Sequence, residues 1–322
     1  MRVFSKVPNI DFMAQRKRAL VLSGLLTLAA IICLLTRGLN LGIDFKGGVL
    51  VEVVYPQTVE LDTVRGELAQ GGYPEAIVQY FGGTQNVLIR LLPDPTASSA
   101  SISTKVLESL DAKAKDVQLR RIEFVGPQVG QELKGDGVLA LFAAFVGIFV
   151  YVMFRFEWKF SLGSIAALTH DAIMTLGFLS LVQEEFDLTV LAGILAMLGY
   201  SNNETIVIFD RIRENLIALR QRSVAEVINL SINQTLLRSI ITHFTVLMVL
   251  SALYFFGGKS VHGFSVAMIV GVLVATYSSI YVSSGVTVLL NLKREDLLPP
   301  EEKDEGIKAE RRAKAENDGA VV

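Results

Sequence analysis

A long hydrophobic stretch that contains a polar run constrains the fold of this chain more than any other feature. Leu188–Phe209 is long enough to cross a bilayer as a single helix, yet the polar run Ser201–Glu204 lies within it. An ionisable group at that depth is costly, so it usually faces the interior of a helix bundle or a wet path. A helix that ends early would instead leave Glu204 at the membrane interface, but the apolar residues of Thr205–Phe209 argue against this. The sequence therefore predicts a functional site around Glu204.

Six apolar stretches predict a polytopic α-helical membrane protein with six transmembrane helices. Of the 322 residues, 51% are hydrophobic and 19% are charged, whereas ordinary soluble domains carry about 25% charge. The single cysteine, Cys33, excludes an internal disulfide and a cysteine metal site. Basic residues precede the first stretch without a small-residue cleavage site after it, which favours a retained anchor helix. We expect the spans at residues 19–36, 138–154, 160–182, 188–209, 239–256 and 264–292.

Lys and Arg in the short loops predict that both termini lie in the cytoplasm. The N-terminal residues 1–18 and the loop 210–238 carry five basic residues each, whereas residues 183–187 carry none. Cytoplasmic loops are the ones enriched in Lys and Arg. The segment 37–134 is expected on the periplasmic side, because long loops cross largely regardless of their charge.

The segment 37–134 has the pattern of a small α+β domain. The order of its elements, β-α-β-β-α-β, predicts a ferredoxin-like periplasmic domain between the first two membrane helices. Ser101 or Ser103 is expected to cap its second helix, after a loop at Pro93–Ser101. Strands are predicted at residues 49–55, 76–81, 86–92 and 117–125, and helices at residues 59–70 and 101–115.

Two further segments are expected on the cytoplasmic side. The connector 210–238 is amphipathic, which is typical either of a helix that lies along the membrane face or of a solvated helical connector. The tail 293–322 alternates charges without apolar periodicity, so we expect it to be disordered.

Two glycine-containing motifs border the predicted outer domain. Leu41–Gly48 follows the first membrane span, and Arg121–Gly130 precedes the second. Glycine pairs permit backbone angles that other residues resist, and Gly-Pro is a turn signal. From the residues alone, both motifs are connectors that hold the domain over the membrane.

Four motifs in register give the chain a specific resemblance to a known family. They read Gly-Ile-Asp-Phe-Lys-Gly-Gly at residues 42–48, Phe-Val-Gly-Pro-Gln-Val-Gly at 124–130, Phe-Arg-Phe-Glu-Trp at 154–158, and Gly-Tyr-Ser-Asn-Asn-Glu-Thr-Ile-Val-Ile-Phe-Asp-Arg-Ile-Arg-Glu-Asn at 199–215. This order resembles the SecF family, the smaller partners of SecD in the RND superfamily. The resemblance covers nearly the whole chain except its two ends.

The resemblance implies a role and a set of partners. It implies a bacterial inner-membrane protein that pairs with SecD and uses the proton-motive force in late steps of preprotein export. The partners implied are SecD, the SecYEG channel, YajC, YidC and an unfolded preprotein in the periplasm. No enzyme activity and no cofactor are implied. The coupling ion would be H⁺, and an acidic relay is equally compatible with Na⁺.

The resemblance also implies a proton-relay role for the polar run. Similar proteins usually carry Asn-Asp after Gly-Tyr-Ser, whereas this chain carries Asn203-Glu204, so the carboxylate is kept one methylene longer. We therefore expect Glu204 to carry the proton, with Asn203 beside it.

Other polar residues within the spans extend the predicted relay. His170-Asp171 also matches the family, but at about 1.5 Å per residue Asp171 lies ~17 Å from the cytoplasmic end of its span and Glu204 ~9 Å from the end of its own. A direct contact between them would need shifted boundaries or a water. His243, at ~7 Å, matches the depth of Glu204 better but departs from the family pattern, so a packed core histidine is the alternative. Arg238 matches a basic family position or is an ordinary membrane-end anchor.

Two other functions were weighed against export. A small-molecule or lipid transporter half of the RND type would need a larger outer domain or a second one, and the loop 257–262 is too short for that. An intramembrane enzyme is disfavoured because neither Gly-x-Ser-x-Gly nor His-Glu-x-x-His occurs. The small residues of the last stretch are expected either to line an interface with SecD or to pack the bundle. They are Gly271, Ala275, Ser278, Ser279, Ser283, Ser284 and Gly285.

Overall fold

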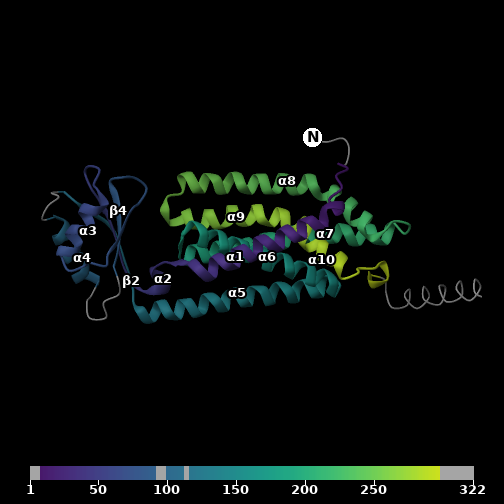
Figure 1. Ribbon diagram of the computed structural model, residues 1–322, viewed down its shortest axis with the longest axis horizontal. Helices are drawn as coiled ribbons and strands as arrows, with labels where there is room; N and C mark the ends of the chain where they lie inside the picture. Colours follow the sequence, from purple (N-terminus) through teal and green to yellow (C-terminus); the bar gives the residue numbers. More distant parts are fainter. Residues whose placement is uncertain (1–7, 92–98, 112–115, 298–322) are drawn as a thin grey trace, which may run out of the picture.

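The computed structural model describes residues 8–91, 99–111 and 116–297 and contains a long helix bundle with a small α+β domain at one end (Figure 1). The side chains of Ser101 and Ser103 and most of the expected loop and tail, at residues 93–98 and 298–322, lie outside the described residues.

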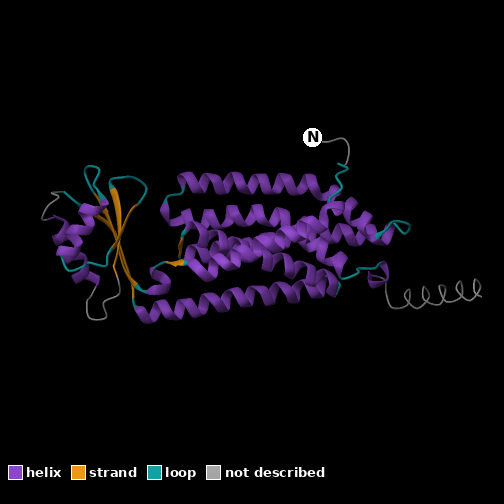
Figure 2. Ribbon diagram, in the orientation of Figure 1, coloured by secondary structure: helices purple, strands orange, loops and turns teal. Residues whose placement is uncertain are grey.

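The α+β domain is an antiparallel sheet covered on one face by two helices (Figure 2). The strands lie in the order β3-β4-β2-β5, and each neighbouring pair is antiparallel. Alternate residues of the central strands, such as Val51 and Ile89, pack with Leu68 and Val106 of the helices. In chain order the elements are β2 (Gly48–Val54), α3 (Leu61–Gln70), β3 (Ile77–Tyr80), β4 (Asn86–Leu91), α4 (Ser99–Asp111) and β5 (Gln118–Val125).

Long helices form the bundle, and the last of them is interrupted by a π-helical turn, η3 (Ser279–Ser283). By length and composition, five segments of the described chain are able to cross a membrane: Met13–Arg37, Pro127–Arg155, Trp158–Val182, Val224–Phe256 and His262–Leu289. The helix α7 is not among these because the polar run reduces its hydropathy, although it is as long as its neighbours. The helices are α1 (Arg16–Arg37), α5 (Pro127–Arg155), α6 (Trp158–Val182), α7 (Leu188–Ala218), α8 (Val224–Phe256), α9 (His262–Ser278) and α10 (Ser284–Leu289).

Several helices extend beyond the boundaries that hydrophobicity predicts. The helix α5 begins at Pro127 instead of residue 138, because proline suits the first turn of a helix and Gly126 precedes it in an extended conformation. Residues 127–134, assigned above to the outer domain, therefore belong to the bundle.

The connector expected at residues 210–238 is not a separate helix. The helix α7 continues to Ala218, and α8 begins at Val224 after a short turn. Ser223 accepts a hydrogen bond from the backbone N–H of Glu226, whose side chain in turn accepts from Ser223, so a capping box starts α8. The apolar residues that suggested a membrane-lying helix pack together instead; this cluster contains Phe209, Ile212, Leu216, Val227, Ile228 and Ile232.

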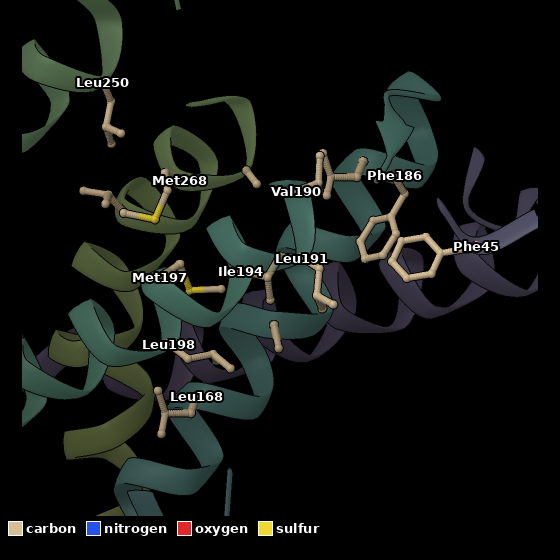
Figure 3. Packing of buried hydrophobic residues seen from close by; sticks show 14 residues of the cluster. Phe45, Leu168, Phe186, Val190, Leu191, Ile194, Met197, Leu198, Leu250 and Met268 are labelled. Atoms are coloured by element: carbon tan, nitrogen blue, oxygen red, sulfur yellow. The ribbon is translucent and has the colours of Figure 1, made fainter. Parts of the chain in front are cut away.

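The helix α7 lies at the centre of the apolar core of the bundle. Figure 3 shows Ile194, Met197 and Leu198 of α7 packed between Leu168 of α6 and Met268 of α9. A methyl group on Gly271 of α9 would lie 2.1 Å from Cγ of Met197, so this glycine allows close approach of the two helices. The small residues of the last span therefore pack the bundle of this chain.

The two glycine-containing motifs meet at the junction between domain and bundle. Residues Ile43–Lys46 form a short helix, α2, that packs on the start of α5. A methyl group on Gly130 would lie 2.8 Å from the backbone nitrogen of Gly47. The motifs are thus one packed joint, and not two independent connectors.

The same joint holds the start of α7. Strand β1 (Asn40–Leu41) pairs in parallel with β6 (Glu185–Phe186) in the loop before α7. One carboxylate oxygen of Asp44 accepts a hydrogen bond from the backbone N–H of Leu188 at 2.9 Å, and the backbone N–H of Gly42 donates to the carbonyl of Phe186 at 2.8 Å. The outer domain is therefore hydrogen-bonded to the first turn of α7.

An ion pair adds to this joint. Arg90 of β4 lies 2.5 Å from Glu185, and both side chains are mostly buried. Burial raises the pKa of the Glu185 carboxyl, and the guanidinium of Arg90 opposes that rise. The pair links the sheet directly to the α6–α7 loop.

We expect Gly47→Ala to loosen the joint. Gly47 has φ 73° and ψ 167°, a region that only glycine adopts readily, and a methyl group there would lie 2.9 Å from Cα of Pro127. The cost is about 1–3 kcal/mol of backbone strain. The thermal unfolding midpoint of the purified protein in detergent should fall by several degrees. Gly126→Ala is the matched control, because Gly126 has extended angles and open space around it; equal effects of the two changes would contradict the packed joint.

Candidate functional site

Two buried polar clusters lie side by side along α7. The first surrounds Asp171 of α6, whose side chain is fully buried. One oxygen of Asp171 accepts hydrogen bonds from the hydroxyls of Ser201 on α7 at 2.6 Å and Ser278 on α9 at 2.8 Å. The other oxygen lies 3.0 Å from Nδ1 of His170. A buried carboxylate is stable only when hydrogen bonds or charges replace its water, and here three helices supply them.

His170 extends this cluster toward α1. Its ring lies 6.3 Å from the ring of Tyr277, whose hydroxyl donates to the carbonyl of Ala19 at 2.7 Å. Its Nε2 is buried and makes no hydrogen bond among the described residues. The contact with Asp171 thus holds the imidazole through Nδ1.

The second cluster surrounds Glu204 of α7. Ser239 of α8 donates a short hydrogen bond to Oε1 of Glu204, and Nε2 of His243, one turn further along α8, lies 4.0 Å from Oε2. Glu204 is 7% exposed and His243 is 4% exposed. Ser239 and His243 share one face of α8 because side chains four positions apart are neighbours on a helix.

The clusters are adjacent but not directly bonded. Ser201 and Glu204 lie one turn apart on α7, so Asp171 contacts Ser201 and not Glu204. The sequence predicts different depths for Asp171 and Glu204, and in the structure each carboxylate has its own set of hydrogen-bond partners. The π-helical turn η3 begins just after Ser278, and such turns recur at functional sites.

Two of the expected relay residues lie elsewhere. Asn203 is exposed, whereas its neighbour Asn202 is buried and accepts a hydrogen bond from Ser164 of α6 at 3.1 Å. Each residue turns a helix by about 100°, so Asn203 faces away from the side that carries Ser201 and Glu204. Arg238 is exposed and forms no ion pair with a described residue. The structure therefore brings together Glu204 with His243, and His170 with Asp171.

Sequence reasoning missed the hydroxyl groups that surround the carboxylates. The sequence prediction uses Ser239 only as the start of a span, and it does not single out Thr276, whose hydroxyl lies 3.1 Å from Nδ1 of His243. A usable signal was present, because Ser239 and His243 have helical spacing within one apolar stretch. The pairing of Ser278 with Asp171 depends on which helices neighbour each other, and a single sequence does not reveal this.

The two buried carboxylates are surrounded by hydroxyl and imidazole groups. Among the described residues, no group of three or more His, Cys, Asp or Glu side chains could hold a metal ion. The serine hydroxyls donate hydrogen bonds to the carboxylates, and imidazole is the side chain whose ordinary pKa lies nearest to neutral pH.

Comparisons with known proteins match most of the chain. A model described as protein export membrane protein SecD/SecF, C-terminal, matches residues 105–293, and a model of the SecD/SecF GG motif matches residues 34–59. The chain is 48% identical over 299 residues to protein translocase subunit SecF of Pseudomonas aeruginosa, covering 93% of this chain and 97% of that protein. It is 43% identical to the SecF subunit of Vibrio alginolyticus, covering 92% and 95%.

Solved structures match as well. The crystal structure of SecDF from Thermus thermophilus, described as a translocon-associated membrane protein, aligns with a TM-score of 0.80 and 37% identity. The alignment covers 88% of this chain and 39% of that one. A crystal structure of SecDF in a super-membrane-facing form aligns with a TM-score of 0.68 and 34% identity, covering 96% of this chain and 41% of that one. This chain thus spans well under half of each SecDF chain.

We expect Ser201→Ala and Ser278→Ala each to destabilise the protein. Each change removes a hydroxyl from a fully buried carboxylate, and a hydrogen bond to a charged group contributes about 1.5–3 kcal/mol. Both should reduce the thermal unfolding midpoint in detergent. Ser283→Ala is the control: Ser283 is equally buried, but its hydroxyl donates to a carbonyl of its own helix, so its loss should have a smaller effect.

Proposed function

Because the chain belongs to the SecF family of protein translocase subunits, we propose that it works with SecD to couple an ion gradient to late steps of preprotein export. The matches confirm the resemblance drawn from the four sequence motifs. The chain is a membrane-embedded translocase subunit, and the small-molecule or lipid transporter alternative is not favoured.

The proposed partner SecD is supported by the relatives and by the surface of the bundle. The alignment covers 39% of the Thermus SecDF chain, and the larger part of that protein, which this chain does not match, is consistent with a SecD partner. Large apolar residues are exposed along α5 and α8, which lipid or a partner helix has to cover; examples are Val138, Leu139, Phe142, Phe244, Met248 and Val249.

The finer architecture belongs to the same proposal. We infer six membrane spans, with α7 as the sixth, because α7 is packed at the centre of the helices that are apolar enough to cross. We infer a ferredoxin-like domain because the strand order and the antiparallel pairing fit that fold. We propose that the protein lies in a bacterial inner membrane, with this domain in the periplasm and both termini in the cytoplasm. The distribution of Lys and Arg over the short loops supports this orientation.

The export partners are inferred from family membership. An unfolded preprotein is the proposed substrate on the periplasmic side. The SecYEG channel is the proposed site from which it emerges, and YajC and YidC are proposed neighbours of the SecD pair. No chemical catalysis and no cofactor are needed for this role.

A single observation supports ion coupling more than any other: Glu204 is buried in the bundle without a fixed cation. Among the described residues, its neighbours are the hydroxyl of Ser239 and the imidazole of His243. An isolated buried carboxylate is strongly disfavoured when ionised, so Glu204 is stable when it carries a proton or faces a protonated His243. A group of this kind gains and loses a proton as its surroundings change.

The Asp171 cluster is proposed as the second part of the relay. It shares α7 and α9 with the Glu204 cluster, through Ser201 and Ser278. H⁺ is the proposed coupling ion, because both carboxylates lie beside an imidazole. Na⁺ is the alternative, since carboxylate and hydroxyl oxygens are also ligands for hard cations.

Replacing Glu204 by Gln should abolish the contribution of this chain to export. Gln has nearly the same shape but cannot exchange a proton. A bacterial host depleted of its own SecF would receive the chain with its cognate SecD, and accumulation of an unprocessed secretory preprotein would be followed. Glu204→Gln should resemble the empty vector, whereas Glu204→Asp should retain export.

The matched control is Glu214→Gln, the same change at an exposed position of the same helix that pairs with Arg211. It should export like the unmutated chain. All variants are first checked for membrane level and for co-purification with SecD. Normal export by Glu204→Gln would refute the proposed relay, and a requirement for Na⁺ in place of a pH gradient would replace H⁺ as the coupling ion.

A further inference from the structure

The proton partner of Glu204 can be identified from the hydrogen bonds of His243. Oε1 of Glu204 is occupied by the hydroxyl of Ser239, so Oε2 is the oxygen that faces His243. The ring nitrogen of His243 that faces Glu204 is Nε2, which is buried and has no hydrogen-bond partner among the described residues. A buried polar atom without a partner is costly, and Glu204 is the neighbour that relieves this cost when a proton lies between them.

Thr276 determines which ring nitrogen of His243 carries the proton. Oγ1 of Thr276 lies 3.1 Å from Nδ1 of His243 and 2.8 Å from the carbonyl oxygen of Val272. A hydroxyl has one hydrogen, and a carbonyl only accepts. The Thr276 hydroxyl therefore donates to Val272 and accepts from N–H at Nδ1, which leaves the lone pair of neutral His243 on Nε2, toward Glu204.

We propose that His243 exchanges the transported proton directly with Glu204, and that Thr276 is a positioning residue that keeps Nε2 available for this exchange. The inference rests on the proton-coupled function proposed above and identifies the group that receives the proton. In the exchange, the O–H bond of protonated Glu204 breaks and an N–H bond forms at Nε2. The electron pair stays on the carboxylate, and the Nδ1–H bond to Thr276 is unchanged.

The geometry requires only a small approach. At 4.0 Å the two atoms are in ion-pair contact, and a hydrogen bond needs about 3 Å, so a shift of about 1 Å brings them together. Catalytic hydrogen bonds are often long at rest and shorten during the working step. Because Glu204 and His243 lie on different helices, a relative movement of α7 and α8 controls this distance.

The surroundings leave the pair isolated from other charges. Asp171 of α6 is turned toward Ser201 and Ser278, and Arg238 is exposed. Among the described residues, the carboxylate of Glu204 and the imidazole of His243 are therefore the two ionisable groups in ion-pair contact here. The groups of the described chain that face this pair are Tyr200 of α7, Ser239 of α8 and Thr276 of α9.

The test uses the purified pair with SecD, reconstituted in liposomes, with histidine labelled by ¹⁵N. Nitrogen chemical shifts distinguish the Nδ1–H tautomer, the Nε2–H tautomer and imidazolium. This chain has three histidines, so comparison with His243→Gln assigns the signal of His243 by subtraction. We expect neutral His243 to be the Nδ1–H tautomer. In Thr276→Val, which removes the acceptor, we expect a mixture of tautomers, whereas Thr276→Ser should keep the original spectrum.

Export driven by a pH gradient gives the functional readout. In Thr276→Val the pH midpoint of export should move to lower pH by about one unit, because the imidazolium form loses a stronger hydrogen bond from Nδ1–H than the neutral ring does. In His243→Gln gradient-driven export should fall about a hundredfold, the lower end of what a positioned acid–base group contributes. The control is Thr245→Val, which removes an exposed hydroxyl of α8 bonded to its own helix and should change neither readout.

The outcomes separate this inference from the proposed function. If Glu204→Gln blocks export while His243→Gln and Thr276→Val leave the rate and the pH midpoint unchanged, the relay is correct and His243 is not its proton partner. An Nε2–H tautomer in the unmutated chain would overturn the role of Thr276. If Glu204→Gln exports normally, the relay itself is wrong.

Discussion

The burial of two carboxylates inside an apolar helix bundle is the constraint on which the arrangement of the helices depends. Asp171 and Glu204 are stable there only because hydroxyl and imidazole groups from neighbouring helices replace water. The helices α7 and α9 each supply residues to both environments, and α6 and α8 complete one environment each. Small residues such as Gly271 allow the close approach that these short polar side chains require. The packing of the core and the proposed proton relay therefore depend on the same helix contacts.

The joint between the outer domain and the bundle follows from the two glycine-containing motifs. Gly47 and Gly130 are in contact, and this contact places α2 where Asp44 reaches the first backbone N–H of α7. An aspartate at a helix N-terminus stabilises the helix through its unpaired N–H groups. Asp187 caps the same helix, with its side chain accepting from the N–H of Val190. The helix that carries Glu204 thus begins between two aspartates, one of which belongs to the segment that leads into the outer domain.

Much of this structure could be predicted from the sequence, and the rest depended on contacts between distant residues. Hydrophobic runs indicated the helices, and alternation indicated the strands of the outer domain. The helix ends were less predictable, since α5 and α7 extend past their apolar stretches under the influence of Pro127 and of the cluster around Phe209. Glu204 was identified because a carboxylate in an apolar stretch is costly. Ser278 and Thr276 were not, because a hydroxyl is common in membrane helices and gains meaning only from the residue opposite. The relay role of Asn203 and Arg238 stays a prediction that their exposed positions do not support.

The pairing of β1 with β6 has a mechanical consequence. Two covalent connections join the outer domain to the bundle, through Gly38 after α1 and Gly126 before α5. These connections alone would let the domain rotate relative to the helices. The strand pairing and the Arg90–Glu185 ion pair add a third attachment, to the α6–α7 loop, which restricts this rotation. While these contacts are intact, a force on the domain is transmitted to the start of α7. Separating the domain from the start of α7 would break the strand pairing and this ion pair, together with the hydrogen bonds that link Gly42 to Phe186 and Asp44 to Leu188.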